Sequence, residues 1–178
     1  MKLNILHLTT DSEIAGAEKL LIGHAQRYDK DKFQVFFATL KQDGKFHQCL
    51  RELNHKVFSL GCQNIFMLAK AIFKLIRILK QNKIDILHTH LYHAGVIGQL
   101  AAKNFHLPKA IMTRHYSDLM YIYGTSFERL LDKWASHWAD HIIAISAGVK
   151  KVLVDLDKVS PSKITVIHNG VDLNEWQT

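Results

Sequence analysis

Residues 84–113 read IDILHTHLYHAGVIGQLAAKNFHLPKAIMT. The aliphatic run 84–89 predicts a strand, the small-residue stretch 94–104 predicts a helix, and 109–113 predicts a second strand. Strands that are apolar almost throughout, rather than in alternation, are typical of parallel sheets buried on both faces. This unit therefore indicates a parallel sheet whose strands are connected by helices.

The same alternation of strand and helix continues toward both ends of the chain. Further strands are expected at 2–9, 33–40, 56–60, 141–145 and 164–167, and further helices at 18–28, 45–54, 64–82, 126–139 and 147–156. Because crossovers between parallel strands are right-handed, about seven such strands predict a doubly wound, mostly parallel α/β sheet with helices on both faces. The 178 residues fit one such Rossmann-like domain, 1–178.

Composition excludes several classes of protein. Hydrophobic residues make up 48% of the chain and charged residues 22%, which is ordinary for a globular protein and excludes general disorder. The only cysteines, Cys49 and Cys62, form no CxxC pair, which excludes a disulfide scaffold. No apolar run reaches the ~18 residues of a membrane span, and the N-terminus lacks a secretory h-region. We therefore expect a cytoplasmic protein.

The formal net charge of +7 raises the question of a nucleic-acid partner. The Lys and Arg residues are scattered along the chain and mixed with acidic residues. The sequence contains no helix-turn-helix, no RNP-type aromatic pattern and no Cys/His finger. We therefore expect no nucleic-acid partner.

The loop after the first expected strand, residues 10–18 (TDSEIAGAE), places Gly16 where the next helix begins. The loop matches neither GxGxxG nor the Walker P-loop, so nicotinamide binding and ATPase activity lose their main support. Free N–H groups and the helix dipole at a helix start still favour an anion such as phosphate. Taken alone, the loop leaves a tight turn as the simpler explanation of Gly16.

Histidines cluster at the end of the fourth expected strand, where His88 and His90 are two residues apart. On a strand they point the same way, and this spacing occurs among ligands of divalent metals. Apart from Asp118, no acidic or thiol ligand follows at a suitable spacing. We favour imidazoles that hydrogen-bond loops or substrate hydroxyls and expect no metal. The alternative is a metal-dependent hydrolase that uses His88, His90 and His115.

The fifth expected strand runs into Arg114 and His115, ahead of a long loop. Basic and imidazole side chains at the carboxyl end of a strand occupy the place where this fold holds its active sites. His115 could take a hydroxyl proton or stabilise developing charge. A histidine that only packs the loop fits the same position equally well.

The expected helix 64–82 carries a basic stripe. Lys70, Lys74, Arg77 and Gln81 fall within about 60° of one another, and the rest of the helix is almost wholly apolar. One interpretation is contact with an anionic membrane surface. The other is a helix wedged between the sheet and a neighbour, with its cations in solvent.

Taken in order, these segments resemble the N-terminal half of a family 4-like (group 1) glycosyltransferase of the GT-B fold. The matching segments are ILHL (5–8), AGAE (15–18), KIDILHTH (83–90), TRH (113–115), DHIIAIS (140–146) and VIHNGVD (166–172). The last two are the most specific. The family usually has Gly-Gly in the first loop, where this chain has Ala15-Gly16, and often proline where it has His168.

The resemblance implies roles for individual residues. Gly16 and Ala17 would lie against the donor phosphate, and His115 would be the catalytic residue beside the transferred sugar or the acceptor hydroxyl. Asn169 and Gly170 would form the turn into an interdomain linker. The residues expected to line the acceptor side of the cleft are Glu18, His88, His90, Arg114, Tyr116, Ser146, Asn169 and Gly170.

The resemblance also implies a two-domain enzyme, in which this domain mainly holds the acceptor. A C-terminal domain, absent from this chain, would hold the nucleotide-sugar donor, so the chain alone would fold but be nearly inactive. Transfer would be retaining and would need no metal or other cofactor. The acceptor would be a glycan, a lipid-linked glycan or a small molecule.

The basic stripe formed by Lys70, Lys74 and Arg77 resembles the segment by which membrane-associated members reach lipid-linked acceptors. It would hold the protein at the cytoplasmic face of the membrane. The alternative to an enzyme half is a stand-alone subunit of a split glycosyltransferase that binds the acceptor or recruits the complex to the membrane.

Overall fold

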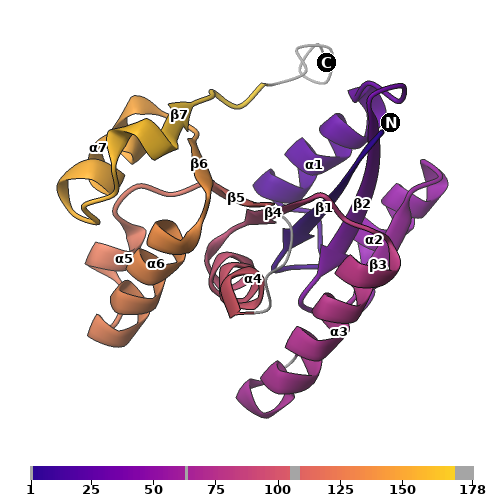
Figure 1. Ribbon diagram of the computed structural model, residues 1–178, viewed down its shortest axis with the longest axis horizontal. Coiled ribbons are helices and arrows are strands. Elements are labelled where there is room, and N and C mark those ends of the chain that lie inside the picture. Colours follow the sequence, from indigo (N-terminus) through magenta and orange to yellow (C-terminus); the bar gives the residue numbers. More distant parts are fainter. Residues whose placement is uncertain (1, 63, 105–108, 171–178) are drawn as a thin grey trace.

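A computed structural model describes residues 2–62, 64–104 and 109–170, which form a seven-stranded sheet flanked by helices (Figure 1). The strands are β1 (Leu3–Thr9), β2 (Phe33–Thr39), β3 (Lys56–Ser59), β4 (Ile86–His90), β5 (Lys109–Arg114), β6 (His141–Ala144) and β7 (Ile164–Val166). They lie in the order β3-β2-β1-β4-β5-β6-β7, and every neighbouring pair is parallel. The expected doubly wound, Rossmann-like fold is confirmed.

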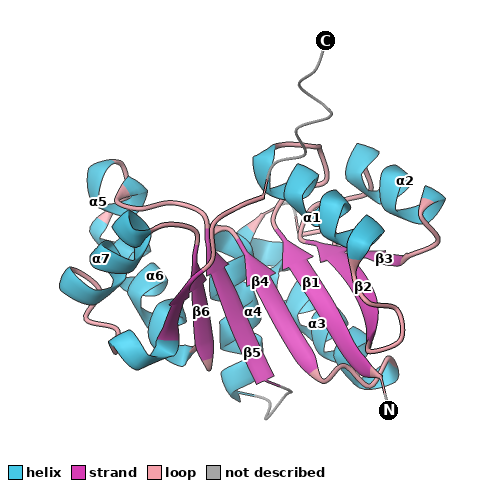
Figure 2. Cartoon of the chain, turned by 90° about the horizontal axis from the view of Figure 1, so that it is seen from above, coloured by secondary structure: helices cyan, strands magenta, loops and turns pink. Residues whose placement is uncertain are grey.

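The direction in which the chain crosses the sheet decides which face each helix covers. The main helices are α1 (Gly16–Arg27), α2 (Lys45–Glu52), α3 (Leu68–Gln81), α4 (Tyr92–Asn104), α6 (Ser126–Trp138) and α7 (Ala147–Asp155). The chain moves from β1 outward to β3, then returns to β4 and continues outward to β7. Right-handed crossovers therefore place α1 and α2 on one face and the later helices on the other, with the strands between them (Figure 2).

Alternate residues of the central strands fill two separate apolar cores. On one face, Leu21 of α1 and Leu50 of α2 pack in one cluster with Phe37 of β2. On the other face, Leu75 of α3 belongs to a cluster with Leu8 of β1. Burial on both sides explains why these strands are apolar along most of their length instead of alternating.

The small residues of α4 allow it to lie close to the sheet. A Cβ atom placed on Gly98 would come within 2.4 Å of Cγ2 of Thr89 in β4, and one on Gly95 would come within 3.2 Å of Sδ of Met112 in β5. The glycines thus let α4 pack directly over β4 and β5. His88 and His90 lie on β4, and His115 directly follows β5.

The structure differs from the sequence prediction at short elements. The expected helix 64–82 begins as a 3-10 turn, η1 (Ile65–Met67), because the backbone N–H of Met67 bonds back to both the carbonyl and the side chain of Asn64. The single-turn helix α5 (Leu119–Ile122) and the 3-10 turn η2 (Pro161–Lys163) were not predicted from the sequence. Elements of three or four residues are too short to show a hydrophobic period.

The apolar side of α3 is explained by packing on the sheet. Ala71, Leu75 and Leu79 are buried in the core, while Lys70, Lys74 and Arg77 are exposed on the opposite side of the helix. Wedging against the sheet, the second interpretation from sequence, therefore accounts for these buried apolar residues of α3. Among the helices that the structure describes, none is long and apolar enough to cross a bilayer.

Candidate functional site

The candidate site lies at the carboxyl edge of the sheet, where the strand order reverses between β1 and β4. In open α/β sheets, ligands bind in the crevice that forms outside the strand ends at such a reversal. The loops after β1 and β4 meet here, since the backbone N–H of Ala94 in α4 donates to Oγ1 of Thr10 at 3.3 Å. The loops after β5 and β6 continue the same edge.

The start of α1 offers free backbone N–H groups at this edge. The helix begins at Gly16, and Ala15, at the N-cap position, provides no side-chain cap. The N–H groups of the first helical turn have no acceptor within the helix, and together with the helix dipole they favour an anion. Both Ala15 and Gly16 are exposed, so a ligand can reach these groups.

The structure does not support the tight-turn explanation of Gly16. Its φ lies outside the left-handed region, and a Cβ atom placed there would meet no atom within 4 Å. Neither the local backbone nor packing therefore requires glycine at this position. A close approach of a ligand to the backbone would require it, which is the arrangement expected for phosphate.

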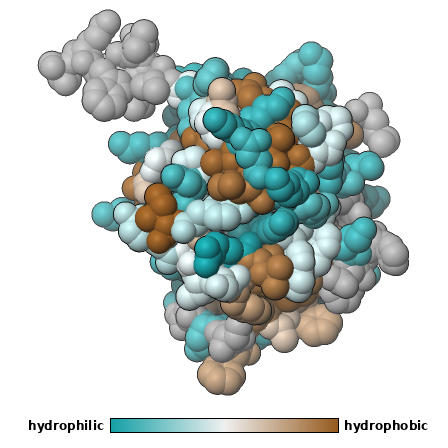
Figure 3. Space-filling view, turned by 90° about the vertical axis from the view of Figure 1, so that its left-hand side faces the viewer, coloured by the Kyte–Doolittle hydropathy of each residue, from teal (hydrophilic) through white to brown (hydrophobic). Residues whose placement is uncertain are grey.

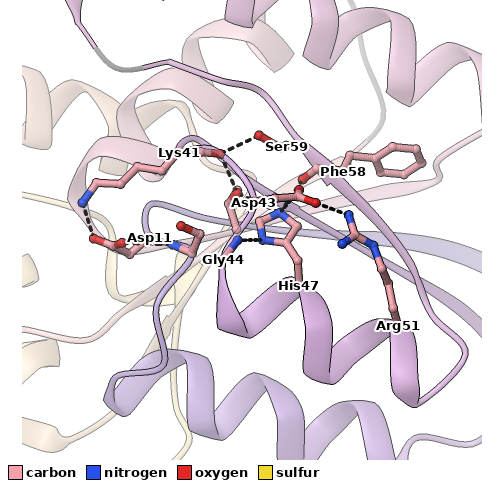
Figure 4. A network of polar contacts seen from close by, with 10 residues as sticks. Asp11, Lys41, Asp43, Gly44, His47, Arg51, Phe58 and Ser59 are labelled. Atoms are coloured by element: carbon pink, nitrogen blue, oxygen red, sulfur yellow. Dashed lines mark hydrogen bonds and ion pairs between the residues drawn. The ribbon is translucent and has the colours of Figure 1, made fainter.

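The loop after β1 is held in place by a polar network shared with the loop after β2 (Figure 4). Nζ of Lys41 lies 2.6 Å from Oδ2 of Asp11, and this hydrogen bond lowers the pKa of the Asp11 carboxyl. The carbonyl of Lys41 accepts hydrogen bonds from Ser59 and Thr39. A Cβ on Gly44 would lie 2.6 Å from the carbonyl oxygen of Ser12, so the two loops touch directly.

Glu18 was expected to line the cleft, but the structure buries its side chain. Its side chain is 1% exposed, and its Oε1 accepts a hydrogen bond from Oγ1 of Thr9 at 2.8 Å. Glu18 lies on the buried side of α1 and fastens the helix to the end of β1. Its role in the described chain is therefore structural.

Three histidines form a buried cluster on the face of the sheet that α1 covers. His7 of β1 lies beside His88 of β4 in the strand register, and His90 follows on the same side of β4. Nδ1 of His7 lies 3.0 Å from Nε2 of His90, and Nε2 of His88 lies 2.7 Å from Oγ1 of Thr113. His88 and His90, which were expected to line the cleft, are thus buried in the described chain.

Burial keeps these imidazoles neutral. Desolvation lowers the pKa of His7 to about 3 and lowers the pKa values of His88 and His90 well below the ordinary value, and the neighbouring histidines add to the effect. The sequence analysis did not single out His7, because it stands within an apolar strand. The pairing of β1 with β4 was the signal that could have placed it beside His88.

The buried cluster bears on the question of a metal. The ligand nitrogens of His7, His88 and His90 all lie within 4.8 Å of one another, close enough to hold an ion. The rings are already engaged, however, since His7 and His90 bond each other and His88 bonds Thr113. His115 lies against Nδ1 of His90, on the opposite side of the ring from the nitrogen that faces His7. His88, His90 and His115 therefore do not converge on one point, as the hydrolase alternative requires.

His115 connects this cluster to an open pocket. Its Nε2 lies 3.3 Å from Nδ1 of His90, and the residue is half-buried. Burial lowers the pKa of His115 to about 4, so its imidazole is neutral at pH 7. The pocket has a volume of about 470 Å³ and is lined by His115, Tyr116, Ser117, Asp118, Leu119, Ile122, Tyr123, Ile145, Ser146 and Val149.

The pocket contains three of the residues expected from sequence, His115, Tyr116 and Ser146. Ser146 is the N-cap of α7, and its Oγ accepts a hydrogen bond from the N–H of Val149. The α5 residues of the pocket wall were missed, because so short a helix gives no sequence signal.

Asn169 and Gly170 are exposed at the end of the described residues, and Val171 and Asp172 of the NGVD motif lie outside them.

Arg114 does not line the cleft, contrary to the prediction. It is 1% exposed and points to the face opposite His115, where its guanidinium lies 2.7 Å from Asp132 and 3.3 Å from Asp157. The ring centre of Tyr116 lies 4.4 Å from the guanidinium carbon of Arg114. The hydroxyl of Tyr116 donates a hydrogen bond to Asp132. This buried ion cluster anchors the segment after β5, and with it the pocket wall, to α6.

Comparison with known proteins shows the family to which the chain belongs. Residues 14–175 match the family described as Glycosyltransferase Family 4. A UDP-Gal:alpha-D-GlcNAc-diphosphoundecaprenol alpha-1,3-galactosyltransferase of Escherichia coli is 26% identical and aligns with 98% of this chain and 46% of its own length. A capsular polysaccharide biosynthesis glycosyltransferase of Staphylococcus aureus is 27% identical, with 97% and 46% coverage.

A solved structure shows the same fold. The Anabaena protein HepE, in complex with UDP, superposes with a TM-score of 0.80 at 21% identity, covering 100% of this chain and 46% of HepE. At this identity the likeness establishes the fold. The chain thus spans about half the length of the relatives that it matches.

Removal of Arg114 tests whether its ion cluster holds the site together. We expect Arg114→Leu to lower the free energy of unfolding by about 3–5 kcal/mol, because two buried carboxylates lose their cation. Arg51→Leu is the matched control, since Arg51 pairs with Asp43 at the surface, where such a pair contributes about 0–1 kcal/mol. Urea unfolding of both variants measures the difference, and equal losses would contradict this role of Arg114.

Proposed function

Because the chain belongs to Glycosyltransferase Family 4, we propose that it is the acceptor-side domain of an enzyme that transfers a hexose from a nucleotide-sugar donor to a glycan or lipid-linked acceptor. The names of its relatives from E. coli and S. aureus support this class of reaction. HepE, which shares the fold, binds UDP, and this supports a nucleotide as the donor's leaving group.

The uncapped start of α1 is the observation that carries the proposal. Transfer from a nucleotide sugar leaves a negatively charged diphosphate and develops positive charge on the sugar ring. Free N–H groups at Gly16 and Ala17 would stabilise the first of these charges. These donors are fixed before the reaction, which is the condition for electrostatic stabilisation of a transition state.

His115 is the proposed catalytic residue. Its neutral imidazole at the pocket wall can exchange hydrogen bonds with a hydroxyl of the transferred sugar or of the acceptor. We propose that transfer is retaining and independent of metal, in line with the family. Metal analysis of purified protein checks the second point, and stoichiometric zinc at the histidine cluster would refute it.

A second domain completes the proposed enzyme. A diphosphate is normally held by cations as well as by N–H groups. Relatives of about twice this length have room for a further domain that supplies such groups. We propose that this second domain binds most of the donor and closes over the pocket, excluding water.

The outer side of α3 is the proposed membrane contact. Lys70, Lys74 and Arg77 are exposed there, and no acidic residue occurs in η1 or α3. Phe66 is 92% exposed and Phe73 is 66% exposed beside these cations. Exposed aromatic rings next to cations suit the interface of an anionic bilayer, where a lipid-linked acceptor would be found.

Apolar side chains are also exposed at α5 and α6, beside the pocket. Ile122, Tyr123 and Phe127 are exposed, and the first two also line the pocket. Figure 3 views the molecule from the side on which these helices lie and shows hydrophobic residues at the surface between hydrophilic ones. An apolar pocket rim suits an acceptor that carries a hydrocarbon chain.

Replacement of Gly16 tests the phosphate site. We expect Gly16→Val to leave stability within about 0.5 kcal/mol of the native value, because a side chain there meets no other group. It should nevertheless weaken donor binding about tenfold or more, because it blocks the approach of phosphate to the helix start. Calorimetric titration of the intact protein with UDP-sugars measures this, and unchanged affinity would remove α1 from the donor site.

Replacement of His115 tests the catalytic assignment. In the intact protein, His115→Ala should lower turnover about 100-fold or more while the thermal midpoint stays close to the native value. His137→Ala is the control, since His137 is an exposed histidine of α6 outside the pocket. UDP release from a UDP-sugar with a polyprenyl-diphosphate sugar acceptor gives the rate. Native turnover in His115→Ala would exclude His115 from catalysis.

Neutralisation of the basic stripe tests membrane contact. We expect Lys70→Gln, Lys74→Gln and Arg77→Gln together to weaken binding to phosphatidylglycerol-containing vesicles more than about tenfold, at about 1 kcal/mol for each cation. The control replaces Lys19, Lys30 and Lys45, which are exposed on the other side of the sheet, with Gln. Vesicle sedimentation compares the two triple variants, and equal losses would refute contact through α3.

A further inference from the structure

A continuous chain of three imidazoles runs from the interior of the sheet to the pocket. Nδ1 of His7 lies 3.0 Å from Nε2 of His90, and Nδ1 of His90 lies 3.3 Å from Nε2 of His115. Each end of the His90 ring is therefore engaged by a different histidine. The last ring, His115, forms part of the pocket wall.

The chemistry of neutral imidazole couples the three rings. A neutral ring carries one N–H and one bare nitrogen, so it donates at one end only when it accepts at the other. If His7 donates to His90, then His90 donates to His115, and the free nitrogen of His115 carries a hydrogen. If the direction is reversed, that nitrogen is bare and accepts a hydrogen bond.

We infer that His90, with His7 behind it, fixes the tautomer and the ring orientation of His115. His90 and His7 are thus positioning residues, since they act on the pocket only through the last ring. The hydrogen-bonded chain of imidazoles stands on its geometry alone, and its effect on catalysis rests on the proposed function. The tautomer decides whether His115 offers a donor or an acceptor to a sugar hydroxyl.

The surroundings of the chain make the coupling effective. His7 and His90 are buried, so water does not compete for their ring nitrogens, and Phe37 stacks on the ring of His7 at 5.4 Å. His88 is buried on the same strand and face but bonds Thr113 instead. His24 of α1 acts on all three rings, His55 also acts on His7, and His88 also acts on His90. A positive charge on any of these neighbours opposes protonation of the chain.

Two substitutions of His90 separate its two contacts. The side-chain amide of Asn can reach the place of Nδ1, so His90→Asn keeps a partner for His115 and gives up the bond to His7. The longer side chain of Gln reaches the place of Nε2, so His90→Gln keeps the bond to His7 and gives up the one to His115. His88→Gln is the control, because it disturbs an equally buried histidine that lies outside the chain.

The measurement is the tautomer ratio of His115, read from long-range ¹H–¹⁵N correlation spectra of the chain labelled with ¹⁵N-histidine at pH 7. We expect one dominant tautomer in the native chain. In His90→Gln the ratio should shift roughly two- to tenfold, the effect of one net hydrogen bond. In His90→Asn it should shift as well, because the amide loses the bond to His7 and can turn either its oxygen or its NH2 group toward His115. In His88→Gln it should stay within about twofold.

An unchanged ratio in His90→Gln, or an equal shift in His88→Gln, would overturn the inference. A second measurement needs no substitution and so does not depend on whether the variants fold. Scalar coupling between ring nitrogens across the His7–His90 and His90–His115 hydrogen bonds should be observed in the native chain, and its absence would also overturn the inference.

The inference and the proposed function can fail separately. If His115→Ala keeps native turnover while the tautomer of His115 still follows His90, the imidazole chain exists but serves another purpose. If both hold, His90→Gln and His90→Asn in the intact protein should each lower kcat with little change in the KM for the donor. A purely structural role of His90 would leave the tautomer ratio of His115 unchanged.

Discussion

The right-handed crossover between parallel strands is the constraint on which the rest of this structure depends. The chain starts at β1, moves outward to β3, and can continue the sheet only by returning to the free side of β1. That return places β4 beside β1 and leaves their two following loops on opposite faces. The start of α1 at this edge and the meeting of His7 with His88 both follow from this reversal.

The two faces of β5 contact groups of different charge. On one face, the cation of Arg114 is buried between Asp132 and Asp157, and this ion cluster fixes the segment that follows the strand. On the other face, the imidazoles next to β5 are kept neutral by burial and by one another. The ion cluster thus anchors the segment after β5 from one face, while only neutral imidazoles contact His115 on the other.

The larger elements could be predicted from sequence because their cause is local. Apolar runs of four to seven residues and helical stretches of eight or more are visible in any window of the chain. The errors concern tertiary structure. Arg114 and His115 are adjacent in sequence but point to opposite faces, and the partners of Arg114 lie 18 and 43 residues further on. The sequence placed Glu18 in the cleft and did not mark His7 as part of a cluster. Both have their hydrogen-bond partners on other elements, which the sequence does not show.

The missing cap of α1 has a consequence for attempts to stabilise this protein. A Ser, Thr or Asp at position 15 would cap the helix and add roughly 0.5–2 kcal/mol to the stability of the fold. The same side chain would occupy the N–H groups that the proposed donor phosphate needs. Under the proposed function, a cap at position 15 would therefore gain stability and lose donor binding, so a redesign guided by helix propensity alone would reduce activity.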